Sequence, residues 1–119
     1  MASLYSKILI ILLVIIGETL MIYAEMIGAK TFAISSNPFL KVFLKMLLIM
    51  TISGGFLIAG YMLGFNAFKN IWAISIASIT AILIIEPILA YSFFKQTPTT
   101  GAIVGFILGV LGFIAALFF

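Results

Sequence analysis

Three glutamates are the residues of this sequence whose type and position could support chemistry. Glu18, Glu25 and Glu86 are its only acidic residues, and each lies inside a long apolar run. An ionisable group inside a membrane-spanning segment costs at least a few kcal/mol and usually marks a functional site. A carboxyl group with little water around it can take up and release a proton near neutral pH. Because a bound cation favours the ionised form, protons and a cation would compete for such a group, as antiport requires.

The spacing of the glutamates directs them toward one side of the membrane. Glu25 lies two helical turns beyond Glu18, on the same face and about 10 Å away along the axis. Glu86 lies in the second half of the third apolar run, which leads toward the same surface. The residues that we predict to bind protons and substrate are Glu18, Glu25, Glu86, Tyr23, Ser75 and Ser78.

A structural role for each carboxyl group is an open alternative. A buried pair with a lysine such as Lys45, or a protonated glutamate bonded to a neighbouring helix, would fix the helix packing. One lysine cannot neutralise three carboxylates, so this explanation fits the set less well than any single glutamate. We expect most serine and threonine hydroxyls in the spans to bond back to their own helix.

The remaining composition excludes most other kinds of site. The chain of 119 residues has no histidine and no cysteine, and its net charge is +3. This inventory excludes a Cys/His zinc site, a disulfide framework, a Ser-His-Asp triad and a thiol nucleophile. We therefore expect no enzyme, no metal and no cofactor. The charge is too small and too dispersed to indicate nucleic-acid binding.

Hydropathy places the chain in a membrane. Hydrophobic residues make up 66% of it and charged residues 8%, whereas a soluble domain is about half apolar and about a quarter charged. A spanning helix takes roughly 20 apolar residues. We predict an all-α bundle of four transmembrane helices and no soluble domain, a single domain over 1–119 in the cell (plasma or inner) membrane. The predicted helices cover residues 8–34, 39–63, 68–94 and 101–119.

Turn residues separate these helices. Asn37 and Pro38 predict the N-cap and first turn of the second helix, and Gly64 predicts its end. The stretch 95–100 predicts the last turn. The lysines are divided almost evenly between the two surfaces, with a slight lean toward cytoplasmic first and third loops.

Glycine and proline indicate where helices pack and bend. Gly101, Gly105 and Gly109 recur every four residues and Gly112 follows, a pattern that lets two helices approach closely. We predict that this strip packs helices together, preferably between two copies of the chain. Pro87 removes a backbone hydrogen bond beside Glu86, and we predict a hinge there, a purely structural kink being an equal alternative.

Several of these motifs resemble those of the small multidrug resistance transporters, within the drug/metabolite transporter superfamily. Ala24-Glu25-Met26-Ile27-Gly28 is similar to their first-helix A-E-x-x-G signature. Phe93-Phe94-Lys95-Gln96 is similar to the end of their third helix, and Gly109-Val110 to the G-V of their fourth. The stretch from Glu86-Pro87 to Gly112 also resembles one half of the ten-helix EamA-type transporters.

The resemblance implies a dimer, inverted or parallel, in which the signature glutamate binds both protons and substrate. The flanking residues favour Glu25 as that glutamate, whereas depth in the membrane favours Glu18. Ser75 and Ser78 stand where the family has the Tyr and Trp of its aromatic lining, which argues against flat aromatic cations as substrates.

These observations predict a dimeric proton-coupled transporter, an antiporter of a small polar or cationic solute. Its partners would be the lipid bilayer, protons, the solute and a second copy of the chain. One alternative is a flippase for a lipid or lipid-linked sugar, which the low polarity of the candidate cavity would suit. Another is a non-transporting membrane scaffold subunit whose acids pair with lysines.

Overall fold

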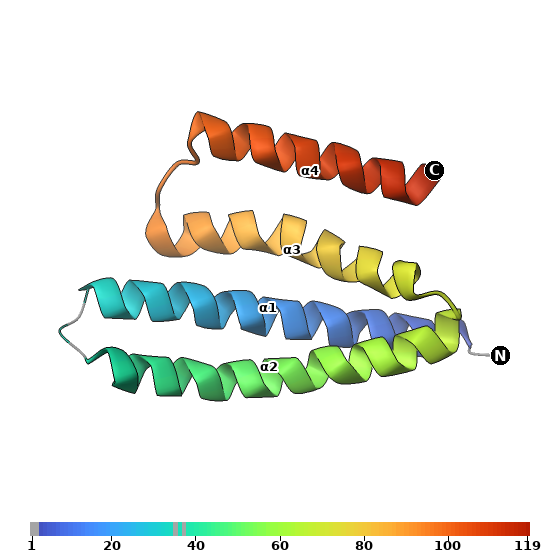
Figure 1. Ribbon diagram of the computed structural model, residues 1–119, viewed down its shortest axis with the longest axis horizontal. Coiled ribbons are helices and arrows are strands. Elements are labelled where there is room, and N and C mark those ends of the chain that lie inside the picture. The colour runs from blue at the N-terminus through green and yellow to red at the C-terminus, as the bar shows by residue number, and fades with distance from the viewer. Residues whose placement is uncertain (1–2, 35, 37) are drawn as a thin grey trace.

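The computed structural model describes residues 3–34, 36 and 38–119, and every regular element in this part of the chain is an α-helix (Figure 1). The prediction of an all-α, four-helix bundle is confirmed. Each helix is long and apolar enough to cross a membrane, so the chain is a multi-pass membrane protein. The helices are α1 (Leu4–Ile34), α2 (Phe39–Phe68), α3 (Ile71–Phe94) and α4 (Thr100–Phe118).

The helices form an antiparallel, flattened arrangement measuring 53 × 34 × 18 Å (Figure 1). α1 packs most extensively against α2 and then against α3, while α2 also touches α3. Among the described residues, α4 contacts α3 alone. The first three helices therefore form one packed unit, with α4 attached along one side.

The turn between α2 and α3 lies later in the chain than predicted. α2 continues through Gly64 to Phe68, where Lys69 adopts a left-handed conformation (φ 59°) and its N–H donates to the Phe65 carbonyl at 2.9 Å. The prediction that α2 ends near Gly64 is therefore wrong, because Lys69 provides the C-cap. α3 begins only at Ile71, with Asn70 as an N-cap that accepts from the Trp72 N–H at 2.9 Å.

The other boundaries need smaller corrections. α1 begins at Leu4, four residues before the predicted start, because the short segment before the apolar run is also helical. Pro38 is the extended residue preceding α2 (φ −61°, ψ 144°) and not a member of its first turn. The predicted N-cap, Asn37, lies outside the described residues.

The hydrophobic core lies toward the α2–α3 turn. Val14 and Ile74 are completely buried, and Ile10 packs with them. Two glycines of α2 permit this contact: a Cβ on Gly60 would meet Val14 Cγ2 at 2.7 Å, and one on Gly64 would meet Ile74 Cδ1 at 2.8 Å. Close packing between helices is the main attraction available within lipid, and these contacts provide it at this end of the molecule.

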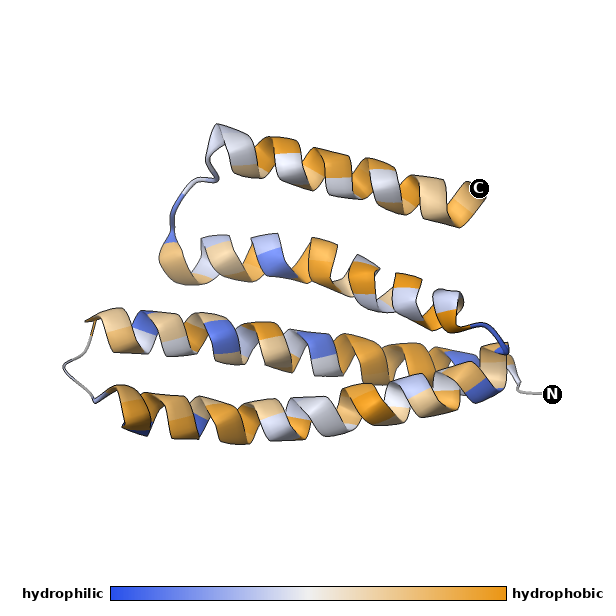
Figure 2. Cartoon of the chain, in the orientation of Figure 1, coloured by the Kyte–Doolittle hydropathy of each residue, from blue (hydrophilic) through white to orange (hydrophobic). Residues whose placement is uncertain are grey.

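Apolar side chains also dominate the outside of the molecule (Figure 2). Hydrophobic colour runs along all four helices, and hydrophilic colour is confined to the connections and a few helical positions. None of the described residues of α4 is buried. The outer surface therefore suits lipid or another apolar surface.

Candidate functional site

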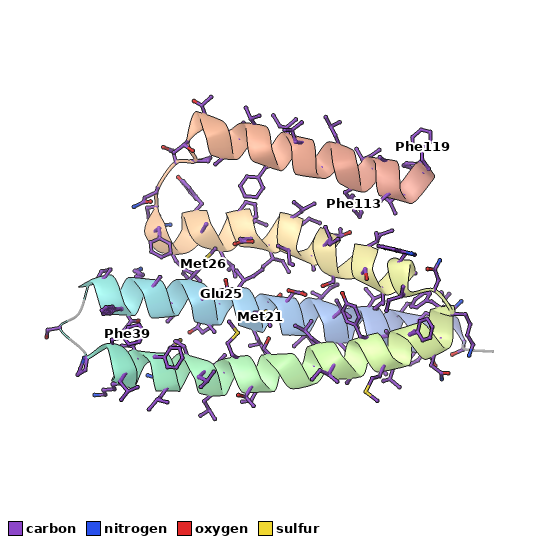
Figure 3. The ribbon with its side chains drawn as sticks, viewed as in Figure 1. Met21, Glu25, Met26, Phe39, Phe113 and Phe119 are labelled. Atoms are coloured by element: carbon purple, nitrogen blue, oxygen red, sulfur yellow. The ribbon has the colours of Figure 1, made fainter. Side chains whose placement is uncertain are left out.

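An apolar groove of about 640 Å³ opens between α1 and α2 near the connection that joins them. Of the described residues that line it, only Glu25 is charged, and its side chain is exposed. Figure 3 labels Glu25 on α1 and Phe39 at the start of α2. On α1 the groove is bordered mainly by small residues, namely Ala24, Gly28, Ala29 and Ala33. On α2 its larger residues are Phe43, Met46, Leu47 and Met50.

Three aromatic rings form the end of the groove nearest the connection between α1 and α2. The Phe32 and Phe39 rings meet edge to face at 5.5 Å, and Phe39 stacks on Phe43 at 5.6 Å. Phe39 and Phe43 are one helical turn apart, so both rings project from the same side of α2. The faces of such rings carry negative potential and attract cations. The sequence reasoning missed these rings, although their spacing on one helix face was the available signal.

Gly28 brings the walls of the groove together below these rings. A Cβ at this position would lie 2.9 Å from Met46 Cγ. The methionine side chain is flexible and fills irregular space, so the wall that it forms can change shape. This close approach gives the last residue of the A-E-x-x-G motif a packing role in this chain.

Glu18 occupies the opposite kind of environment. Its side chain is 6% exposed, and its Oε1 accepts a hydrogen bond from the Oγ of Ser78, which is also buried. This bond joins the middle of α1 to α3. Two of the predicted site residues are thus brought into contact, but in a closed position between helices.

A second buried hydrogen bond lies one residue away on α1. The hydroxyl of Ser53, completely buried in α2, donates to the Gly17 carbonyl at 2.6 Å. A Cβ on Gly17 would lie 2.8 Å from the Leu57 side chain and 3.2 Å from its backbone nitrogen. The centre of α1 is therefore bonded to α2 through Gly17 and to α3 through Glu18.

Other hydroxyls behave as expected for helices in lipid. The Thr19 hydroxyl donates to the Ile15 carbonyl, and Thr51 and Thr80 donate to carbonyls of their own helices in the same way. Against this background, the bonds from Ser53 and Ser78 to another helix are distinctive.

Glu86 and Pro87 line a separate pocket of about 380 Å³ between α3 and α4, which Met26 of α1 also reaches. Glu86 is half-buried there. The charges of Glu86 and Glu18 act on Glu25, although Glu86 and Glu25 line different pockets. α3 remains helical through Pro87.

The other predicted site residues lie apart from the groove. The Tyr23 ring packs edge to face on Phe93 of α3 at 5.8 Å. It projects from a different face of α1 than Glu25 does, since two residues turn the helix by about 200°. Ser75 is half-buried on α3, one turn before Ser78.

The glycines of α4 are used unequally within the chain. A Cβ on Gly109 would meet Leu83 of α3 at 3.2 Å, while Gly105 and Gly112 have no other atom within 4 Å of such a Cβ. Gly101 is also exposed. One of the four glycines therefore packs against α3, whereas the strip through Gly105 and Gly112 has no partner among the described residues.

Within residues 3–34, 36 and 38–119, no lysine lies within 4.0 Å of a glutamate carboxylate. The same residues contain no group of three or more His, Cys, Asp or Glu side chains that could hold a metal ion. The lysine pairing considered from the sequence is thus not formed by the described residues. In this part of the chain the charge of Glu25 has no basic partner.

Comparisons with family models, with curated proteins and with solved structures found no match. The fold itself defines a class, a four-helix integral membrane protein with carboxyl groups inside its spans. Within that class, the distinguishing feature is a single exposed carboxyl in an apolar groove.

Proposed function

We propose that the chain is a dimeric, proton-coupled antiporter of a small cationic solute in the cell membrane, with Glu25 as the group that protons and solute share. The observation that carries this proposal is the exposed carboxyl of Glu25 in an apolar groove, with no lysine partner among the described residues. The similarity of Ala24-Glu25-Met26-Ile27-Gly28 to the signature of the small multidrug resistance family supports the same choice.

The chemistry of the groove favours a singly charged cation with apolar substituents. One carboxylate can neutralise one positive charge, and a charge buried in apolar surroundings requires such a partner. Phe32, Phe39 and Phe43 add ring faces for the cation and apolar area for its substituents. Protonation of Glu25 would remove the attraction and release the cation, which couples the two fluxes.

Glu18 and Glu86 take supporting positions in this mechanism. Glu18 is enclosed and bonded to Ser78, so it reaches a solute only if α1 and α3 separate. Glu86 lies near Glu25 electrostatically but in another pocket. Their like charges would favour holding a proton or a cation nearby, since three ionised carboxylates repel one another.

The dimer in this proposal would use α4. None of its residues is buried, it contacts α3 alone among the described helices, and Gly105 and Gly112 leave space for another helix. Small residues at such positions let helix backbones approach closely in lipid. A second copy of α4, parallel or inverted, suits this surface.

The experiment is solute-driven proton flux in vesicles that contain the purified protein and a pH-sensitive dye. Quaternary ammonium ions from tetramethylammonium to tetrabutylammonium would serve as substrates, which also tests the preference for apolar substituents. We expect Glu25→Gln to abolish the flux, while the control Lys41→Gln, which changes a charge on the exposed side of α2, leaves it intact. If Glu25→Gln leaves the flux unchanged, Glu25 is not the shared group and the mechanism is wrong.

A flippase for a lipid or lipid-linked sugar is the second candidate. The groove is almost entirely apolar, with Glu25 as its one charge among the described lining residues, and this suits an acyl or polyprenyl chain. Scrambling of labelled lipid in vesicles without a pH gradient would favour this candidate. The scaffold alternative has less support, because the acid–lysine pairs that it requires are not formed by the described residues.

A further inference from the structure

A pocket of about 800 Å³ lies at the end of the molecule opposite the Glu25 groove, where α1 begins and α2 ends. Two lysines from different elements line it, Lys7 on α1 and Lys69 after α2. Ser6 and Asn66 add a hydroxyl and an amide. None of the described lining residues is acidic, and the nearest acid in the sequence, Glu18, is three helical turns from Lys7.

Local structure holds both lysines at this pocket. Lys69 is fixed in the left-handed conformation that ends α2, and its ammonium group contacts Asn66 Oδ1 at 3.4 Å. The Lys7 ammonium lies 5.4 Å from the centre of the Phe68 ring. This cation–π contact positions the ammonium group itself, and an ammonium has three N–H donors, so donors remain for an anion.

The rest of the pocket is apolar. Leu9, Ile10, Leu63 and Ala67 form it beside the polar groups. A free inorganic anion has no apolar part to contact such a surface, whereas a lipid carries acyl chains next to its charged phosphate. Trp72 and Phe65, both exposed near this turn, are residues typical of the headgroup level of a bilayer.

We propose that this pocket binds the headgroup phosphate of an anionic phospholipid. Lys7 and Lys69 carry the charge interaction, Asn66 and Ser6 donate hydrogen bonds to phosphate oxygens, and the apolar residues receive the start of the acyl chains. The site is independent of the transport proposal, because it uses neither a glutamate nor the groove.

The test is a lipid titration of the purified protein in detergent, with bound lipid counted by native mass spectrometry. Phosphatidylglycerol is the probe and phosphatidylcholine the neutral comparison. A lysine at a membrane surface strengthens binding to anionic lipid by about fivefold, so Lys7→Gln/Lys69→Gln should weaken phosphatidylglycerol binding by roughly 25-fold. Binding of phosphatidylcholine should not change.

The chain supplies a closely matched control. Lys95 ends α3 in the same left-handed conformation as Lys69 (φ 56°), and its ammonium lies 5.7 Å from the Tyr91 ring centre, yet it does not line this pocket. Lys41→Gln/Lys95→Gln removes two charges at the other surface and should leave phosphatidylglycerol binding intact. An equal loss in both double variants would overturn the proposal, because the effect would then follow total charge.

Four further measurements make the outcome decisive. The single variants Lys7→Gln and Lys69→Gln should each weaken binding by about fivefold, and added salt should weaken phosphatidylglycerol binding to the unaltered protein. Inorganic phosphate and glycerol 3-phosphate should not displace the lipid. Displacement by either at comparable concentration would make a soluble phosphate the ligand and overturn the lipid assignment. Helical circular dichroism would verify that each variant is folded.

Discussion

Glu18 and Glu25 lie two turns apart on one face of α1, yet their surroundings differ completely. Glu18 is buried and accepts a hydrogen bond from Ser78 of α3, next to Gly17, whose carbonyl accepts one from α2. Glu25 is exposed in a groove bordered by small and flexible side chains. The difference shows that a carboxyl group in a membrane span can hold helices together or remain available to a ligand. Packing by the neighbouring helices decides which of the two it does.

Chemical modification tests the difference in accessibility between Glu18 and Glu25 most directly. Dicyclohexylcarbodiimide, an apolar reagent for carboxyl groups in membranes, should label Glu25 about a hundredfold faster than Glu18. Reaching Glu18 requires α1 and α3 to separate, and each 1.4 kcal/mol of opening slows labelling about tenfold. Peptide mass spectrometry would measure both rates, with Glu25→Gln as the control for site assignment. Equal rates would mean that the two environments do not differ as described.

Two glycines on α1 allow the same comparison through stability. Gly17→Ala should lower the free energy of unfolding by about 2 kcal/mol, because its Cβ would collide with the Leu57 side chain and approach its backbone. Gly28→Ala should cost less than about 1 kcal/mol, since Met46 can move aside. Unfolding in mixed micelles, followed by circular dichroism, would measure both. A larger loss of unfolding free energy for Gly28→Ala than for Gly17→Ala would contradict this, because it would make the contact with Met46 the more rigid one.

A double-mutant cycle would sharpen the assignment of Glu18. Ser78→Ala removes its donor, and the bond between Glu18 and Ser78 should contribute about 1 kcal/mol, a typical value for a hydrogen bond between membrane helices. The cycle with Glu18→Ala, which removes the acceptor oxygen, isolates this coupling. The same cycle with Ser75→Ala, one turn earlier on α3, should give a coupling near zero. A coupling at Ser75 as strong as at Ser78 would contradict the geometry.

The smallest expected effect concerns the aromatic end of the groove. Phe43→Ala should weaken tetrabutylammonium binding about threefold, which is within the usual range for an exposed cation–π contact. Phe65→Ala, a comparably exposed phenylalanine at the other end of α2, should leave it unchanged. Isothermal titration calorimetry would measure the affinities. If both substitutions act equally, the groove around Glu25 is not the binding surface.

The helices and their order could be predicted because hydropathy and turn residues are local signals. The ends were less predictable where packing competed with turn chemistry. Gly64 has the residue type of a helix C-cap, but in this chain it admits Ile74 and the helix continues to Lys69. No local pattern distinguishes a glycine that ends a helix from one that admits a neighbour.

The sequence identifies the three glutamates as candidate site residues, but it does not predict that their surroundings differ. Seven-residue spacing predicts that Glu18 and Glu25 share a face, but burial depends on where α3 crosses α1. The contact between Glu18 and Ser78 joins positions 60 residues apart, which spacing alone cannot reveal.

That long separation has a consequence for biosynthesis. When α1 leaves the ribosome, the serine that will satisfy Glu18 has not yet been made, and at about 5 to 20 residues per second it follows roughly 3 to 12 s later. During this interval the Glu18 carboxyl lacks its hydrogen-bond donor from α3. It needs either a temporary partner in the insertion machinery or a bound proton that removes its charge. The final position of α1 in the bilayer is therefore fixed only when α3 has been inserted.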